Sequence, residues 1–500
     1  MTTVQWNNTS PLSMSKPIPS DGNASALATV IRMVATAFVL RLAFVLLVFR
    51  DVASAGVAHQ QFGWEMGWVA RSIALAHGFS SPFAPSTGAT ALVPPLYPCL
   101  LALVFRIYGL YSPHAALAIL SLNSICSALT CVPVYLLGRE VGGSRVGKIA
   151  GWLWVVYPFS VYFSSTRVWD YSVTSLLLAA CWWLTQRAGR RGSVKQAAVI
   201  GILFGVAALS NPSVLSMFPI ALGFTLWRMH RLGNRWLRFG LVVVLFTAAV
   251  LAPWTIRNAK VLHAAVPVRD GFWLEFWAGN HGDTSTSNPS SAHPASNEAE
   301  MTLYQQLGEV AYVSQKRALG LAYVRQHPVA FLVVSTRRVL RFWTGFWSAS
   351  ASYLRDEPLD VPNVFFCSAV TFLMLRGVLR SWRNSPEATV TTILMLLVFP
   401  LPYYLTHSSM DYRQPIEPEI VMMVALGLPR RFSLPSRNRR GLLHVASFAK
   451  AKAHSENPPV VVHVPYAMAR DIRDAGIRVV LFSNVLKFSG GHLRAMLSDF

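Results

Sequence analysis

Long apolar runs alternate with short polar segments along most of this chain. The first run, 27–49, exceeds the roughly 20 residues that a helix needs to cross a bilayer, and no small-residue cleavage site follows it. We therefore interpret it as a retained membrane helix. Further spanning helices are predicted at 114–138, 149–165, 171–186, 196–210, 213–227, 239–256, 363–379, 390–405 and 416–428. The pattern predicts an all-α polytopic membrane protein with about 10–12 transmembrane helices.

Two shorter apolar segments do not fit a full crossing. The segment 96–108 follows Pro94 and Pro95, which favours a half-inserted helix at the outer membrane surface. The segment 328–343 carries Arg337, Arg338 and Arg341 on an apolar background, as an interfacial helix does.

Composition supports a membrane protein and argues against two soluble classes. The chain is 53% hydrophobic and 13% charged, whereas soluble domains carry roughly 25% charged residues. Its net charge of +22 comes from Lys and Arg placed between apolar runs. That placement follows the positive-inside rule, so we expect no nucleic-acid partner. The five cysteines lie in or beside apolar runs without metal-ligand spacing, which predicts neither disulfides nor a zinc site.

The basic residues also predict which side of the membrane each loop faces. If the basic clusters are all cytoplasmic, the apolar runs cross in pairs. These clusters lie at 139–148, 187–195, 228–238, 376–383 and 430–440. Four polar segments then converge on the outer face: the loop around Glu65, the turn 166–170, the segment 257–326 and the turn 407–417.

Domain organisation follows from the same pattern. Residues 1–26 are polar and predict a disordered cytoplasmic lead. Residues 27–430 form the transmembrane domain, with a first outer loop at 51–95 and a long outer loop at 257–361. Residues 431–500 are predicted to be a cytoplasmic tail of unknown role. Within that tail, 460–464, 467–475 and 478–483 are typical of a strand, a helix and a strand.

Two acids in the predicted outer loops are candidate catalytic residues. Glu65 lies among aromatic residues and glycines in a turn-rich loop, where it can serve as a general base or merely favour a helix N-terminus. Asp170 precedes the helix that begins near Tyr171, so it is either a helix cap or a second acid of the site.

Candidate substrate contacts lie in the same outer segments. Arg257 and Arg269 can bind a phosphate through two guanidinium nitrogens, although Arg257 can also simply anchor the end of its span. Arg413 is either a further cationic contact or an i,i+4 partner of Glu417. Tyr97, Glu275 and Asn280 complete the candidate set. A lone histidine such as His293 is more often structural than a ligand.

The order of these motifs resembles the GT-C superfamily of membrane glycosyltransferases. The features are an acid in the first outer loop, the stretch 94–98 (Pro-Pro-Leu-Tyr-Pro) opening a helix, and a second acid at a short outer turn. The branch it resembles most is the bacterial aminoarabinose-transferase and protein O-mannosyltransferase type, over roughly 27–428. Val93 stands where the family often has a charged pair, so phosphate contact would fall to arginines.

The resemblance implies a lipid-linked sugar, a polyprenyl-phosphate sugar, as donor. It also implies transfer to a glycan, lipid or protein acceptor on the outer face of the bacterial cytoplasmic membrane, with membrane lipids as further partners. Glu65 and Asp170 match the two acids of the family. No metal-ligand cluster is predicted from the sequence, while the family leaves a divalent metal open. No nucleotide-binding motif is present.

Our hypothesis is an inverting transferase in which Glu65 deprotonates an acceptor hydroxyl. The alternatives are a polytopic lipid or sugar transporter (a flippase) and a membrane scaffold in which Glu65 is only a helix cap. A transporter predicts ionisable residues within the spans and an internal repeat, and Arg41 is the one such residue that we note.

Overall fold

The computed structural model describes residues 20–54, 62–83, 87–281, 292–345, 347, 360–384 and 386–429, together with 461–463, 480–482 and 485–487. The chain divides into two compact units, Met1–Leu428 and Pro429–Phe500. Most of the expected N-terminal lead and parts of the two expected outer loops lie outside the described residues.

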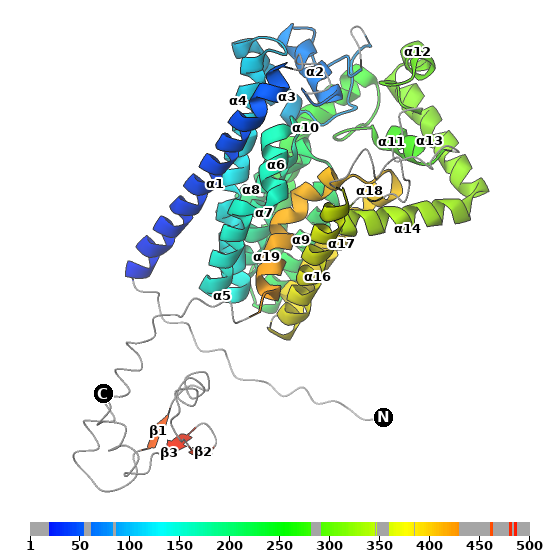
Figure 1. The fold of residues 1–500 in the computed structure, drawn as a ribbon. Helices are drawn as coiled ribbons and strands as arrows, with labels where there is room; N and C mark the ends of the chain where they lie inside the picture. The colour runs from blue at the N-terminus through cyan, green and yellow to red at the C-terminus, as the bar shows by residue number, and fades with distance from the viewer. Residues whose placement is uncertain are drawn as a thin grey trace, which may run out of the picture. The chain divides into compact units, whose positions relative to one another are not determined.

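The first unit is a bundle of helices (Figure 1). From the N-terminus they are α1 (Ser20–Ser54), α2 (Glu65–Ala74), α3 (Leu96–Tyr108), α4 (Pro113–Leu129), α5 (Cys131–Val156), α6 (Pro158–Thr166), α7 (Tyr171–Arg191), α8 (Val194–Ser210), α9 (Val214–Arg231), α10 (Trp236–Leu262) and α11 (Phe272–Gly279). They continue with α12 (Glu298–Leu307), α13 (Glu309–Gln326), α14 (Pro328–Thr344), α16 (Asp360–Asn384), α17 (Pro386–Val398), α18 (Leu401–Leu405), the 3-10 helix η3 (Met410–Ile416) and α19 (Glu417–Gly427).

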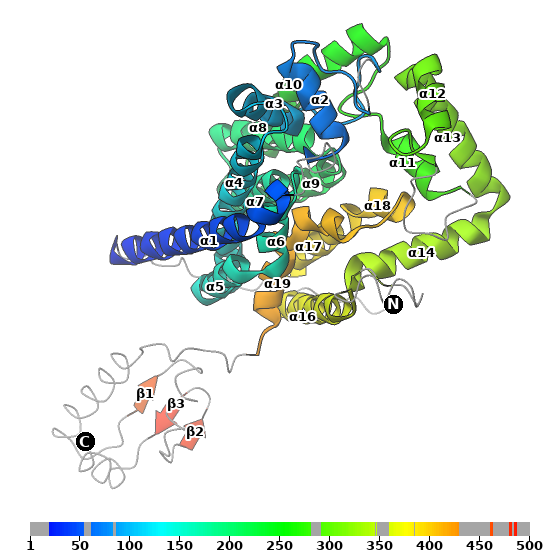
Figure 2. The same ribbon diagram turned by 45° about the horizontal axis from the view of Figure 1, so that its top comes forward.

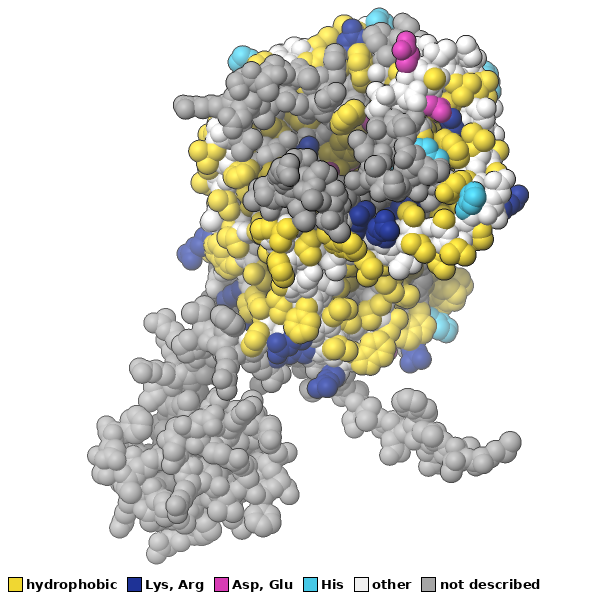
Figure 3. All heavy atoms as spheres, turned by 45° about the vertical axis from the view of Figure 1, so that its right-hand side comes forward, with side chains coloured by type: hydrophobic (Ala, Val, Ile, Leu, Met, Phe, Trp, Pro, Cys, Tyr) yellow, Lys and Arg dark blue, Asp and Glu magenta, His cyan; other side chains and the backbone are white. Residues whose placement is uncertain are grey.

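The predicted all-α polytopic membrane fold is confirmed. Among the described helices, five stretches are long and apolar enough to cross a membrane: Ser25–Leu47, Pro113–Val156, Trp236–Leu262, Val361–Arg383 and Pro386–Leu405. Shorter apolar helices, including α8, lie between them in the bundle. Figure 3 shows hydrophobic side chains over the side of the bundle and basic side chains along its lower edge.

The stretch Pro113–Val156 folds back on itself at Gly143. This glycine has φ 82° and ψ 176°, a conformation that only glycine adopts readily. On the two sides of the turn, Gly138 and Gly147 lie so close that a Cβ on Gly138 would be 3.0 Å from the Gly147 Cα. The turn therefore separates the runs predicted at 114–138 and 149–165 into an antiparallel pair.

A buried arginine joins α1 to the helices beside it. The guanidinium of Arg41 donates to the hydroxyls of Ser127 at 2.8 Å and Ser160 at 2.7 Å, and to three backbone carbonyls. These bonds offset much of the cost of burying a charge in the bundle. Arg41 therefore has a full structural explanation, and no transport role is needed for it.

The helices α12, α13 and α14 form an arm to one side of the bundle, which Figures 1 and 2 show from two directions. The helix α14 corresponds to the predicted interfacial helix. Its exposed side chains include Val329 and Leu332, which are 73% and 66% exposed. On the same helix Arg338 and Phe342 are buried, and Arg338 donates to the carbonyls of Gly279 and Leu405.

The second unit contains a three-stranded antiparallel sheet in the order β1-β3-β2. The strands are β1 (Val461–His463), β2 (Val480–Phe482) and β3 (Val485–Lys487). The first two lie within predicted strands, and β3 was not predicted. The helix expected at 467–475 lies outside the described residues.

Candidate active site

A cavity of about 500 Å³ lies at one end of the bundle. The helices α7 and α9 both begin at this cavity and run to segments rich in arginine at the other end. There Arg190, Arg228 and Glu140 line a separate space of about 250 Å³. The cavity and the basic clusters therefore lie at opposite ends of the same helices.

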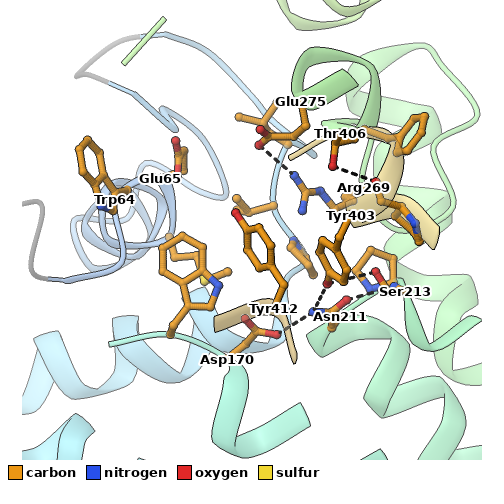
Figure 4. Close-up of a pocket in the computed structure, with 18 of the residues that line it drawn as sticks. Trp64, Glu65, Asp170, Asn211, Ser213, Arg269, Glu275, Tyr403, Thr406 and Tyr412 are labelled. Atoms are coloured by element: carbon orange, nitrogen blue, oxygen red, sulfur yellow. Dashed lines mark hydrogen bonds and ion pairs between the residues drawn. The ribbon is translucent and has the colours of Figure 1, made fainter. Parts of the chain in front are cut away.

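Seven separate segments contribute to the cavity wall, and Figure 4 shows many of their side chains. They are residues 64–66, 92–94, 169–171, 210–216, 269–275, 293–296 and 402–412. Each of the four segments predicted to face outward contributes to this wall. These segments meet at one end of the bundle because the helices that they connect run through it in antiparallel pairs.

Glu65 is the first residue of α2, and a glycine brings its loop against the turn that carries Asp170. Gly63 has φ 80°, and a Cβ at this position would lie 2.6 Å from the Val168 carbonyl oxygen. The neighbouring Phe62 is fully buried and packs edge-on against Phe105 with ring centroids 5.3 Å apart. The loop is therefore held against the bundle by a close backbone approach and a buried aromatic ring.

The Glu65 carboxylate lies in the cavity with 17% of its side chain exposed. Its Oε1 is 3.8 Å from Nε2 of His293. Burial raises the pKa of Glu65, while His293 and Arg269 lower it and Glu275 raises it. A carboxylate whose pKa is raised in a partly closed site has the properties required of a general base.

Asp170 lies at the start of α7 and is only 2% exposed. Its side chain does not cap the helix backbone. Instead its Oδ2 accepts hydrogen bonds from the Thr174 hydroxyl at 2.8 Å and from Nδ2 of Asn211 at 3.3 Å. Burial raises the pKa of Asp170 to about 6, although those two bonds lower it in part. Side-chain capping of α7, the structural alternative for Asp170, is therefore not what the structure shows.

Arg269 is the one arginine or lysine among the described residues that line the cavity. Its Nη2 lies 3.7 Å from Oε1 of Glu275, and its Nε is buried without a hydrogen-bond partner among the described residues. Its charge lowers the pKa of both Glu65 and Asp170. Arg269 thus lies close enough to act electrostatically on both acids.

Glu275 lies near Arg269 and His407 at the cavity wall. Its Oε2 is 3.6 Å from Nδ1 of His407, whose Nε2 is 2.6 Å from the Tyr412 hydroxyl. Burial raises the pKa of Glu275, but His407, His293 and Arg269 outweigh it and leave the pKa below its usual value. Burial also lowers the pKa of His407. Glu275 is therefore a stable carboxylate at neutral pH.

Aromatic rings form much of the remaining wall, and the sequence analysis did not assign them to the site. Tyr403 and Tyr412 stack with centroids 4.6 Å apart at 11°, and Trp169 stacks on Tyr171 at 5.9 Å. The Tyr403 hydroxyl also lies 3.4 Å from Nδ2 of Asn211. Such rings can pack against a sugar face while their polar atoms remain available for hydrogen bonds. No local signal in the sequence links segments so far apart.

Four predicted substrate contacts do not line the cavity. Tyr97 is buried and exchanges hydrogen bonds with the side chain of Asn123. Arg257 lies within α10, whose helix extends beyond the predicted end at 256, and donates to the carbonyls of Thr90 and Phe79. Both side chains hold the bundle and its loops together.

The other two predicted substrate contacts, Asn280 and Arg413, also interact with residues outside the cavity. Nδ2 of Asn280 donates to the carbonyls of Phe276 and Leu405. Arg413 is buried, and its Nε lies 2.5 Å from Oε1 of Glu417. The i,i+4 alternative is therefore the observed one for Arg413. Of the predicted substrate contacts, Arg269 and Glu275 remain at the cavity.

Among the described residues, no group of three or more His, Cys, Asp or Glu side chains is arranged to hold a metal ion.

A family model for dolichyl-phosphate-mannose-protein mannosyltransferases matches residues 92–254. No curated protein sequence matches the chain.

Several solved structures are similar at low sequence identity. The archaeal oligosaccharyltransferase AglB from Archaeoglobus fulgidus, in complex with an inhibitory peptide and a dolichol-phosphate, is 14% identical with a TM-score of 0.49. That match covers 92% of this chain and 55% of AglB, so the chain spans little more than half of that protein.

ArnT from Cupriavidus metallidurans is similar in two states. The apo form is 14% identical with a TM-score of 0.35, covering 94% of this chain and 99% of ArnT. The form bound to undecaprenyl phosphate is 14% identical with a TM-score of 0.33, covering 90% and 97%. The family match over 92–254 bears out what the order of the motifs indicates: this chain is similar to the GT-C superfamily of membrane glycosyltransferases.

Proposed function

We propose that this protein is a membrane glycosyltransferase that moves a sugar from a polyprenyl-phosphate donor to an acceptor hydroxyl. One observation carries the proposal: Glu65, Asp170 and Arg269, from three distant segments, line one cavity at the end of an apolar bundle. The description of the matched family names a lipid-phosphate sugar, and we propose the same class of donor here.

The proposed reaction is a single displacement at the anomeric carbon. The acceptor oxygen forms the new bond as the bond from the anomeric carbon to the phosphate oxygen breaks. The acceptor proton passes to Glu65, and the electron pair leaves with polyprenyl phosphate. Attack from the face opposite the phosphate inverts the anomeric centre.

The remaining residues stabilise and orient the reactants in this proposal. Arg269, whose side chain lines the cavity, contacts the donor phosphate through its guanidinium and stabilises the charge that develops on it. Asp170, fixed by Thr174 and Asn211, orients the sugar together with the stacked Tyr403 and Tyr412. The prenyl chain lies along the apolar helices.

We place the cavity on the outer face of the cytoplasmic membrane. The cavity and the basic clusters lie at opposite ends of α7 and α9, and basic clusters are typical of the cytoplasmic side. A lipid-linked sugar is also a donor that can be used at the outer face, because the reaction then requires no nucleotide on that side of the membrane.

Donor consumption by the purified protein in detergent tests the function. Labelled polyprenyl-phosphate sugars are supplied as a panel, with an envelope extract as acceptor. We expect at least one donor to release polyprenyl phosphate and its sugar to appear on the acceptor. If the whole panel stays intact while the protein moves the same lipids across vesicles, the transporter is correct and the transferase is wrong.

A further inference from the structure

His293 is held in one orientation beside the candidate base. Its Nδ1 accepts a hydrogen bond from the Ala295 backbone N–H at 3.2 Å. Its ring packs edge-on against Phe83, with centroids 5.3 Å apart at an interplanar angle of 90°. The side chain is 13% exposed and lines the cavity. These contacts limit how the ring can turn.

The contact with Ala295 also decides which ring nitrogen carries the proton. A neutral imidazole has one N–H donor and one acceptor nitrogen. Because Nδ1 is the acceptor for Ala295, the proton of the neutral ring resides on Nε2. That atom lies 3.8 Å from Oε1 of Glu65. A shift of less than one ångström brings the pair to hydrogen-bond distance, and catalytic hydrogen bonds often tighten when substrate binds.

We propose that His293 is a positioning residue for Glu65, and that its Nε2–H orients the carboxylate and favours its ionised form. This inference rests on the proposed function, because it gives Glu65 the role of the base. It differs from the purely structural interpretation of a lone histidine. The histidine would assist the base without contacting the substrate.

The charges that face Glu65 give the direction of the expected effect. Burial raises the pKa of Glu65, His293 and Arg269 lower it, and Glu275 raises it. Without the donor at position 293, burial and Glu275 still raise the pKa of Glu65, and only a backbone hydrogen bond to Glu65 and the charge of Arg269 still lower it. The pKa of Glu65 then rises, and a larger fraction of it is protonated and inactive at a given acidic pH.

The test is the pH profile of kcat/KM for the wild type, His293→Leu and His293→Gln. Leucine removes the donor, whereas the glutamine amide nitrogen can reproduce an N–H near the position of Nε2. We expect the acidic limb of the Leu variant to move upward by about one pH unit, or about tenfold in rate on that limb. The Gln variant keeps its limb near the wild-type position. His77→Leu, an exposed site outside the cavity, is the control and leaves the limb unchanged.

If the acidic limb of the kcat/KM profile does not move in His293→Leu, the proposal is overturned. It is also overturned if the limb of His293→Gln moves as far as that of His293→Leu.

A second measurement does not depend on turnover: nitrogen NMR of the full chain with labelled histidine. The His293 signal, assigned by its loss in His293→Gln, should show the Nε2–H form, and the chemical shift of Nε2 should change in Glu65→Gln. If the wild type consumes no donor, the proposed function fails while this measurement still decides the contact. A His293 ring that is protonated on Nδ1, with a signal that does not change in Glu65→Gln, would refute the proposed contact between His293 and Glu65.

Discussion

Burial sets the two cavity acids apart from ordinary surface carboxylates. The side chains of Glu65 and Asp170 are largely withdrawn from water, and burial raises the pKa of both. Keeping an ionised acid in such a place costs stability, because the charged form loses hydration. A cost of this kind is common at functional sites, where it serves the chemistry.

Replacing Asp170 by Asn separates its functional role from a structural one. Because its pKa is raised to about 6, the native state binds more protons than the unfolded state between about pH 4 and 6. The charged form therefore reduces stability above pH 6, and Asn removes that cost while it can still accept from Thr174. We expect the Asp170→Asn melting temperature at pH 7.5 to equal or exceed the wild-type value. Turnover should fall by about 10²-fold through lost positioning.

A melting temperature well below that of the wild type would instead assign Asp170 a structural role. The control is the same comparison at pH 4.5, where Asp170 is protonated. There the melting temperatures of the wild type and of Asp170→Asn should converge.

Arg269 is predicted to contact the donor phosphate. Arg269→Gln removes the guanidinium and should lower kcat/KM for the donor by about 10²–10³-fold, the effect of losing one preorganised donor. Arg269→Lys keeps the charge but loses the planar fork, so it should recover only part of the activity. Arg325→Gln, an exposed arginine on α13, is the matched control. Equal losses at both positions would contradict a specific phosphate contact.

The sequence alone singled out two acids that line the cavity, whereas most of the predicted substrate contacts lie outside it. Glu65 and Asp170 stand out because charged residues are scarce in this chain. Arg257 and Arg413 look similar in the sequence, yet backbone carbonyls hold Arg257 and Glu417 pairs with Arg413. Whether an arginine is already occupied depends on distant residues, so only the fold could show it.

At the scale of elements, one buried acid fastens the arm to the cavity wall. Glu309, the first residue of α13, accepts hydrogen bonds from the Thr90 hydroxyl, from the Ala91 backbone N–H at 2.6 Å and from the Tyr304 hydroxyl at 2.9 Å. The Asp270 backbone N–H donates to the Ala91 carbonyl at 3.1 Å. The loop 90–94, whose residues 92–94 line the cavity, is thereby tied to the arm and to the segment that carries Arg269.

This contact should weaken as pH rises. Burial and the neighbouring Asp270 raise the pKa of Glu309 to about 7, and burial raises the pKa of Asp270 to about 6. Both pKa values lie above those of the unfolded chain, so their contribution to stability is complete below about pH 4 and declines up to about pH 7. Wild type should therefore exceed Glu309→Gln in melting temperature at pH 5, and the gap should shrink by pH 8.

Exposed Glu298 on α12 provides the matched control for this comparison, since Glu298→Gln should follow the wild type at every pH. A gap for Glu309→Gln that is constant across the range would contradict the titration of this acid.

The long helices of the bundle could be predicted because they are apolar runs separated by polar, glycine-containing or proline-containing segments. Their boundaries were less certain, as α10 shows by running to Leu262 past the predicted end at 256. The arm could not be predicted as an arm, because its attachment depends on Glu309 and Arg338 reaching residues far away in the sequence. The spacing of hydrophobic residues along the sequence predicts a helix, but it does not indicate which distant residues that helix contacts.

At the scale of the whole molecule, the cavity and the hairpin turn at Gly143 should face opposite sides of the membrane. Ser296 lies at the cavity and Ser144 at the turn, and both are exposed. In a background with the exposed Cys99 changed to Ala, an impermeant maleimide applied to intact cells should label Ser296→Cys but not Ser144→Cys. Permeabilised cells should label both. Labelling of both positions in intact cells would overturn the proposed sidedness.

The most direct test of the central claim is single-turnover consumption of a donor by Glu65→Gln beside the wild type. Glu300→Gln, in which the acid that pairs with Lys316 on the arm is changed, is run as a control outside the cavity. With equal melting temperatures confirmed, we predict that Glu65→Gln is slower by about 10²–10⁴-fold, the contribution of a general base, and that Glu300→Gln stays within about threefold of the wild type. Equal rates for Glu65→Gln and the wild type would show that this cavity acid is not the base.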